Sequence, residues 1–137
     1  MELFKFCSII NRQYKLIALM CFFSSNLCSS EVSLIATGDV LLDRKIVNYI
    51  VQEGENYPFI HVAELFKNST ISIGNLESSI STKGKPTLKK KWNFRAHPKR
   101  IEGLKYAGFD VLNLANNHSM DYGKEALLET IELLNKA

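Results

Sequence analysis

The segment NLANNHSMDYG, residues 113–123, places two amides and an imidazole directly after an apolar run. The run covers residues 109–114, and Asn116, Asn117 and His118 follow it. Histidine is the commonest metal ligand and exchanges protons near neutral pH. An asparagine pair alone is usually part of a turn. The segment therefore predicts chemistry only if other polar groups lie beside it.

Two earlier apolar runs end in the same way. Asp39 follows residues 32–37, and Asn75 and Glu77 follow residues 69–74. In open α/β sheets, ligands bind outside the carboxyl ends of the strands. A single aspartate at a strand end usually forms a turn or a helix cap. Three strand ends that all carry polar groups predict one shared site.

The side chains at these strand ends form a hard ligand set. Carboxylate and amide oxygens with an imidazole nitrogen suit Mg²⁺, Mn²⁺, Fe or Zn²⁺, and no thiolate is present. Such ions lower the pKa of bound water and polarise phosphoryl or acyl oxygens. The sequence therefore predicts a divalent-metal site for metal-assisted hydrolysis.

The elements that position these residues alternate between strand and helix. The apolar run at residues 32–37 is typical of a strand covered on both faces. Pro98 is expected to begin a helix that Gly108 closes, and Asp121 is expected to cap the last helix. This alternation predicts an α/β fold. Apolar residues recur at helical spacing in this last helix, residues 122–137, and in two further segments, 46–51 and 59–66.

The first thirty residues have the order of an export signal, in which positive charges precede an apolar core and small polar residues follow. The core, residues 16–23, is too short to span a bilayer. We expect residues 1–30 to be a signal peptide or an uncleaved N-terminal anchor; lipid attachment at Cys28 is a weaker alternative. The protein is then exported, with a periplasmic, extracytoplasmic or membrane-associated location.

Charge is concentrated in one segment of the body, residues 31–137. The chain has 17 basic and 14 acidic residues, and only one more basic than acidic residue lies in the body. Residues 83–100, the basic segment, carry eight Lys and Arg and no Asp or Glu, with Trp92 and Phe94 among them. Such a field attracts polyanions. An anionic envelope polymer suits an exported protein, whereas nucleic acid does not; the alternative is a solvated loop.

Four motifs occur in a fixed order: ATGDV at 36–40, GNLE at 74–77, FRAHP at 94–98, and AGFD, LANNH and DYG between 107 and 123. Together they resemble the CapA capsule-synthesis (poly-γ-glutamate biosynthesis) family, which is similar to the calcineurin-like metallophosphoesterases. The resemblance covers the whole body. It implies the N-terminal half of a layered metallophosphoesterase-like α/β sandwich.

The resemblance also implies roles for particular residues. Asp39, Glu77 and Asn117 would be metal ligands, with Glu77 where the superfamily usually has a bridging aspartate. His118 would stabilise or protonate the leaving group. His97 precedes a proline, and a structural turn is the reading that its position favours. Five residues are expected to contact substrate or support the ligands: Arg44, Asn75, Asn116, Arg95 and His97.

Members of the family run to several hundred residues and carry further histidine motifs. We therefore expect this chain to be a fragment, a truncated frame or a degenerate copy with part of the metal site and no activity of its own. Two classes of function stay open. One is a metal-dependent hydrolase-like protein that handles an anionic capsular polymer beside membrane-bound synthase or ligase components. The other is a non-catalytic envelope protein that binds the polymer.

Overall fold

A computed structural model describes residues 31–88 and 90–137. The leader at residues 1–30, expected to be a signal peptide or anchor, lies outside this part of the chain. None of the helices within it is long and apolar enough to cross a membrane. The elements, in chain order, are β1 (Leu34–Val40), α2 (Ile46–Glu53), the 3₁₀ helix η1 (Tyr57–Phe59), α3 (Ala63–Lys67), β2 (Ile71–Leu76), β3 (Ser79–Ile80), β4 (Arg95–Ala96), the 3₁₀ helix η2 (Pro98–Arg100), α4 (Ile101–Ala107), β5 (Val111–Asn113) and α5 (Gly123–Asn135).

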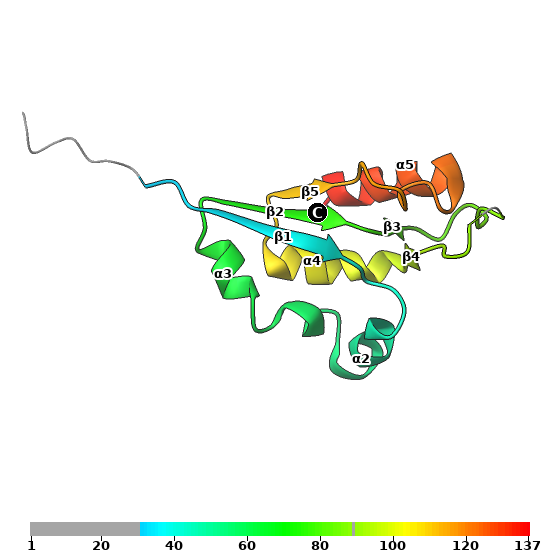
Figure 1. Ribbon diagram of the computed structural model, residues 1–137. Helices are drawn as coiled ribbons and strands as arrows, with labels where there is room; N and C mark the ends of the chain where they lie inside the picture. The colour runs from blue at the N-terminus through cyan, green and yellow to red at the C-terminus, as the bar shows by residue number, and fades with distance from the viewer. Residues whose placement is uncertain (1–30, 89) are drawn as a thin grey trace, which may run out of the picture. The chain divides into compact units, whose positions relative to one another are not determined.

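A three-stranded parallel sheet has β2 at its centre, between β1 and β5 (Figure 1). In its register Ile35 pairs with Ser72, and Ile73 pairs with Val111. A second, smaller parallel pair joins β3 to β4. The predicted α/β fold is confirmed. Parallel pairing also brings the carboxyl ends of all three main strands to one edge, where the predicted site residues lie.

The first strand is longer than expected. It runs to Val40, so Asp39 lies within β1 rather than after it. The pairing with β2 shifts between Ala36 and Asp39 and then resumes, with Asp39 opposite Asn75. An irregularity of this kind re-aims side chains near the end of a strand. Here it sets the Asp39 carboxylate beside the residues that follow β2.

The core lies on the side of the sheet that α3 and α4 cover (Figure 1), and Leu133 and Leu134 of α5 also pack against it. Buried Leu76 and Leu104 pack in this core, and the Phe66 ring lies 4.9 Å from the Phe109 ring. Packed apolar and aromatic side chains of this kind are the main stabilising contribution to a small domain. This side therefore holds the strands in register.

The opposite face of the sheet is largely open. Leu34, Ile71 and Val111 expose 60%, 38% and 47% of their surfaces, so the expectation that the first strand is covered on both faces is wrong for the described residues. The reason is the position of α5, which packs along β3 instead of across the main sheet. Thr130 Oγ1 on α5 accepts a hydrogen bond from Ile80 N at 2.9 Å.

Two helix predictions need correction, and one is confirmed. The helix expected over residues 59–66 is divided into η1 and α3, because the backbone of Val62 (φ −122°) leaves the helical region. Asp121 does not cap α5, which begins after Tyr122 without a side-chain cap. Pro98 does open a helical segment, and Gly108 ends it in the left-handed conformation (φ 82°) that favours glycine.

Candidate functional site

Three polar side chains from β1 and β2 meet at the carboxyl edge of the sheet. The Asn75 amide Nδ2 donates to Asp39 Oδ1 at 2.7 Å and to Glu77 Oε2 at 2.8 Å. Asn75 and Asp39 are paired in the β1–β2 register, and Glu77 directly follows β2. The structure thus brings both predicted carboxylates to one nitrogen atom.

The end of β5 adds two more amides to this group. Asn113 Nδ2 and Asn116 Nδ2 donate to Asn75 Oδ1 at 2.8 and 3.0 Å. Because Asn75 Oδ1 accepts both bonds, Asn75 turns its Nδ2 toward the carboxylates. Asn75 therefore orients the Asp39 and Glu77 carboxylates through its Nδ2, while its Oδ1 is used by the two other amides. Asn113 belongs to the same network, although the sequence analysis did not select it.

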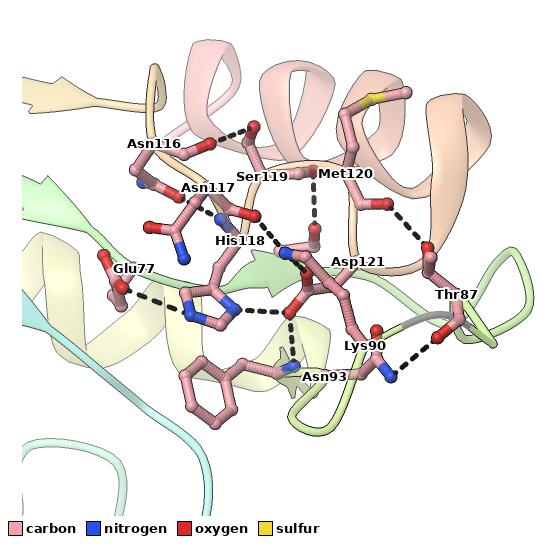
Figure 2. Close-up of polar contacts among 12 residues, drawn as sticks. Glu77, Thr87, Lys90, Asn93, Asn116, Asn117, His118, Ser119, Met120 and Asp121 are labelled. Atoms are coloured by element: carbon pink, nitrogen blue, oxygen red, sulfur yellow. Dashed lines mark hydrogen bonds and ion pairs between the residues drawn. The ribbon is translucent and has the colours of Figure 1, made fainter.

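The turn after β5 presents His118 to these carboxylates. Asn116 Oδ1 accepts a hydrogen bond from His118 N at 2.9 Å and so shapes the turn. Figure 2 shows the His118 ring between Glu77 and Asp121. His118 Nε2 lies 3.6 Å from Glu77 Oε1, and His118 Nδ1 lies 2.6 Å from Asp121 Oδ2. Both ring nitrogens therefore face carboxylates.

Asp121 is a candidate functional residue that the sequence analysis missed, because it was assigned to capping. Its side chain is fully buried and accepts hydrogen bonds from Lys90 Nζ at 2.6 Å and Phe94 N at 2.8 Å. Burial opposes its ionisation, but hydrogen bonds from the Lys90 ammonium, the His118 ring and one backbone amide outweigh burial and lower its pKa. The His-x-x-Asp spacing in the turn was the available sequence signal.

The ionised Asp121 fixes the proton arrangement of the imidazole. A carboxylate only accepts hydrogen bonds, so His118 Nδ1 must carry the proton between them. The other nitrogen, Nε2, is then the atom that can take up or release a proton. It faces Glu77 at the edge of the site. This arrangement suits general acid or base chemistry next to the carboxylate pair.

The donor set fits a divalent cation in part. Asp39 and Glu77 offer converging hard oxygens, which such ions prefer. The Asn117 side chain is exposed, and within the described part of the chain no hydrogen bond joins it to either carboxylate. Among residues 31–88 and 90–137, no three His, Cys, Asp or Glu side chains are spaced to hold a metal ion. Metal ligation by Asn117 stays a prediction.

Two of the expected substrate contacts have other partners. The Arg95 guanidinium lies 4.1 Å from the Tyr122 ring centroid and donates to Lys83 O at 3.3 Å. His97 Nδ1 accepts a hydrogen bond from Lys99 N at 3.2 Å and caps η2. The turn role that the sequence favours for His97 is therefore present. The substrate roles of Arg95 and His97 stay predictions.

Arg44 contacts the site indirectly, because it packs on the Phe94 ring that also contacts His118. Its Cζ lies 4.6 Å from the centroid of Phe94, and the His118 ring lies 4.2 Å from that same centroid. A cation over an aromatic face is attracted by the ring's electrons. Phe94 thus links the guanidinium of Arg44 to the imidazole. The turn after β1, which holds Arg44, and the turn after β5, which holds His118, thus both contact Phe94.

These features define an α/β protein with a polar site at the carboxyl edge of a parallel sheet, which is where such folds bind ligands. Residues 33–137 match the family described as "Bacterial capsule synthesis protein PGA_cap", and the chain belongs to this family. The resemblance expected from the four motifs is confirmed. The α/β sandwich expected for the family agrees with the helices and parallel strands seen here.

Three relatives support the family assignment. The chain is 31% identical over 112 residues to "Capsule biosynthesis protein CapA" of Bacillus anthracis, covering 80% of this chain and 27% of the relative. It is 30% identical over 95 residues to "PGA biosynthesis protein CapA" of Bacillus subtilis (strain 168), covering 69% and 25%. It is 30% identical over 110 residues to "Uncharacterized protein y4sH" of Sinorhizobium fredii, covering 77% and 23%. The chain spans about a quarter of the length of these relatives.

Proposed function

We propose that the protein acts at the cell envelope in the synthesis, export or processing of an anionic capsular polymer of the poly-γ-glutamate type. Its family and the names of two relatives support a role connected with the capsule. The export-like leader supports the location, and the basic segment supports an anionic partner. The proposed protein partners are membrane-bound polymer synthase or ligase components. We do not propose nucleic acid as a partner.

The proposed chemistry is metal-assisted. Asp39, Glu77 and Asn117 would hold a divalent cation such as Mn, Zn, Fe or Mg. When bound, such an ion polarises an acyl or phosphoryl oxygen and lowers the pKa of water. The carboxylates fit this task because Asn75 already holds both of them toward one point. Their negative charges would otherwise repel one another at the strand ends.

One observation carries the catalytic proposal: the imidazole of His118 is held at Nδ1 by a buried carboxylate, while its Nε2 faces Glu77. His118 would deliver a proton from Nε2 to the leaving group of a bound substrate. Asp121 would keep the ring in the tautomer and orientation that this step needs. A positioned acid of this kind contributes about 10²–10⁴ in rate.

A non-catalytic, polymer-binding protein is the second candidate. The arrangement of possible metal ligands favours this candidate, because no three acidic, histidine or cysteine side chains in the described ranges are spaced to hold a metal ion. In that case the basic segment would bind the polymer, and the strand-end residues would only be structural. The two candidates differ in whether the polymer changes length.

The experiment incubates a version extended by the rest of the family domain with poly-γ-glutamate and each of the four metals, beside the 137-residue chain, and follows polymer length by gel filtration. The enzyme proposal predicts shortening that His118→Ala reduces by about 10²–10⁴. His61→Ala serves as the matched control, because His61 is exposed and outside the site network. A polymer that binds without any change in length would support the second candidate instead.

A further inference from the structure

Arg44 adopts an unusual backbone conformation. It is the one residue other than glycine with a positive φ, 63°, among the described residues. The left-handed region is unfavourable for side chains with a Cβ atom. Residues in such conformations persist only where surrounding contacts determine them, and they cluster at ligand sites. The contacts around Arg44 therefore need an explanation.

The carboxylate of Asp43 holds Arg44 in place. Asp43 Oδ1 accepts a hydrogen bond from Arg44 N at 2.7 Å, and Asp43 Oδ2 accepts one from Arg95 N at 3.0 Å. One carboxylate thus joins the turn after β1 to the start of β4. Since Trp92 and Phe94 lie just before β4, this link also fixes Arg44 relative to both rings.

The Arg44 guanidinium lies on aromatic rings, and among residues 31–88 and 90–137 no carboxylate pairs with it. Its Cζ is 4.4 Å from the Trp92 ring centroid and 4.6 Å from that of Phe94. Lys91 Nζ is 5.3 Å from the Trp92 centroid. In the described part of the chain, no carboxylate forms an ion pair with Arg44 or Lys91. Two cations therefore flank one indole that is 52% exposed.

We propose that Arg44, Lys91 and Trp92 form a binding site for a flexible chain that carries carboxylates at regular intervals. Arg44 would take one carboxylate through its planar fork, and Lys91 would take a neighbouring one. The exposed Trp92 face would pack against the apolar backbone between them. Two carboxylates on one chain bind more tightly than two separate ones, because the second contact is intramolecular.

The proposed binding site lies near His118, because both contact Phe94. The Phe94 ring lies close to both the Arg44 guanidinium (4.6 Å) and the His118 ring (4.2 Å), so a chain bound at Arg44 would lie near the catalytic candidate. The strained turn is then a means of presenting Arg44 before the ligand arrives, which lowers the entropic cost of binding. This inference rests on the proposed function for naming poly-γ-glutamate as the polymer. That the ligand carries repeated carboxylates is argued from Arg44, Lys91 and Trp92.

Trp92 is the sole tryptophan of the sequence, so its fluorescence reports directly on the site. The experiment titrates the protein with a poly-γ-glutamate oligomer, free glutamate and polyphosphate, at constant ionic strength and with a chelator present. We expect a saturable change with the oligomer at concentrations at least about tenfold below those needed for free glutamate. Polyphosphate of equal charge that binds as tightly as the oligomer would overturn the carboxylate assignment.

Variants separate this site from the general field of the basic segment. Arg44→Gln and Lys91→Gln should each weaken oligomer binding by about fivefold or more, because each removes one contact of a bivalent ligand. Lys45→Gln removes the same charge from the next residue, which is exposed and contacts neither ring, and should change binding by less than about twofold. Equal losses in all three variants would show a diffuse electrostatic effect and refute the site.

Arg44→Gly tests whether the strained turn serves binding. Glycine adopts a positive φ without strain. The variant should keep its melting temperature and lose binding as Arg44→Gln does. A clear fall in melting temperature with unchanged oligomer binding would show that Arg44 is only structural. The titration contains a chelator and no metal, so it measures binding alone. Oligomer binding here, together with no shortening of the polymer in the metal-containing assay, would contradict the enzyme proposal and leave this inference intact.

Discussion

At the scale of single residues, Asp121 determines how His118 can act. The buried carboxylate accepts bonds from Lys90, His118 and the Phe94 backbone amide. A buried acceptor with several charged or polar donors contributes both orientation and stability. Lys90 therefore has a structural role, because its ammonium is already paired with Asp121.

We predict that Asp121→Ala lowers the free energy of unfolding by about 1–3 kcal/mol, since it leaves the buried donors without an acceptor. It should also reduce any turnover, because His118 Nδ1 loses its partner. Urea unfolding measures the first effect. Glu132→Ala is the control, since its ion pair with Lys136 is exposed and screened by solvent, so that its loss should change the free energy of unfolding little. Equal losses in both variants would contradict the prediction.

The pH dependence of stability follows from the same carboxylate. The folded-state pKa of Asp121 lies below its ordinary value of 3.8, so its contribution is present above pH 3.8 and is lost as pH falls through the folded pKa. Asp110 behaves alike, because hydrogen bonds from the Ser72 backbone and side chain lower its pKa. Urea midpoints measured through this range should fall with acid. Asp121→Asn should make the fall shallower, and an unchanged slope would exclude Asp121 as a cause.

At the scale of elements, the central position of β2 decides whether the site assembles. Asn75 can reach both carboxylates because β2 lies close to β1 and β5. Gly74 makes this closeness possible: a Cβ there would lie 2.9 Å from Phe109 Cε1 and 3.0 Å from Thr37 Oγ1. Strand glycines often mark such close approaches.

We predict that Gly74→Ala destabilises the protein by about 1–3 kcal/mol through overpacking. The matched control is Gly38→Ala on β1, where a Cβ would meet nothing within 4 Å. Thermal unfolding of both variants gives the comparison. A Gly74→Ala protein as stable as the Gly38→Ala protein would mean that the sheet adjusts without cost.

The sequence predicted the three strands and their polar ends because apolar runs and the residues after them are local signals. It did not predict that Asp39 lies inside β1, since that depends on a register shift against β2. Asp121 was missed for a similar reason. Its partners Lys90 and Phe94 are far away in the chain, and only the folded structure brings them to it.

At the scale of the whole molecule, the basic segment divides into two groups of cations. Lys90 pairs with the buried Asp121, and the buried Arg100 pairs with the half-buried Glu55 at 2.6 Å. Others, such as Lys85 and Lys91, are exposed and form no ion pair among the described residues. The second group is the part of the segment that an anionic polymer can reach.

We predict that polymer binding weakens steeply with salt and that Lys85→Gln with Lys91→Gln reduces it at low ionic strength, since exposed charges are screened by salt. Lys90→Gln should mainly lower stability, because it removes the counter-charge of Asp121. Binding assays at several salt concentrations, together with urea unfolding, test both parts. Salt-independent binding would mean that electrostatic attraction is not the cause.

The central claim is that three strand ends form one divalent-metal site, and nuclear magnetic resonance of the protein during Mn²⁺ titration tests it most directly. A paramagnetic ion broadens the signals of nearby groups, even when it binds weakly. If the site forms, the side-chain amides of Asn75, Asn113 and Asn116 should broaden first and together. Asp39→Ala or Glu77→Ala should remove this effect, whereas His118→Ala should leave it unchanged. Broadening that begins elsewhere, or that survives loss of both carboxylates, would show that the three strand ends do not form one metal site.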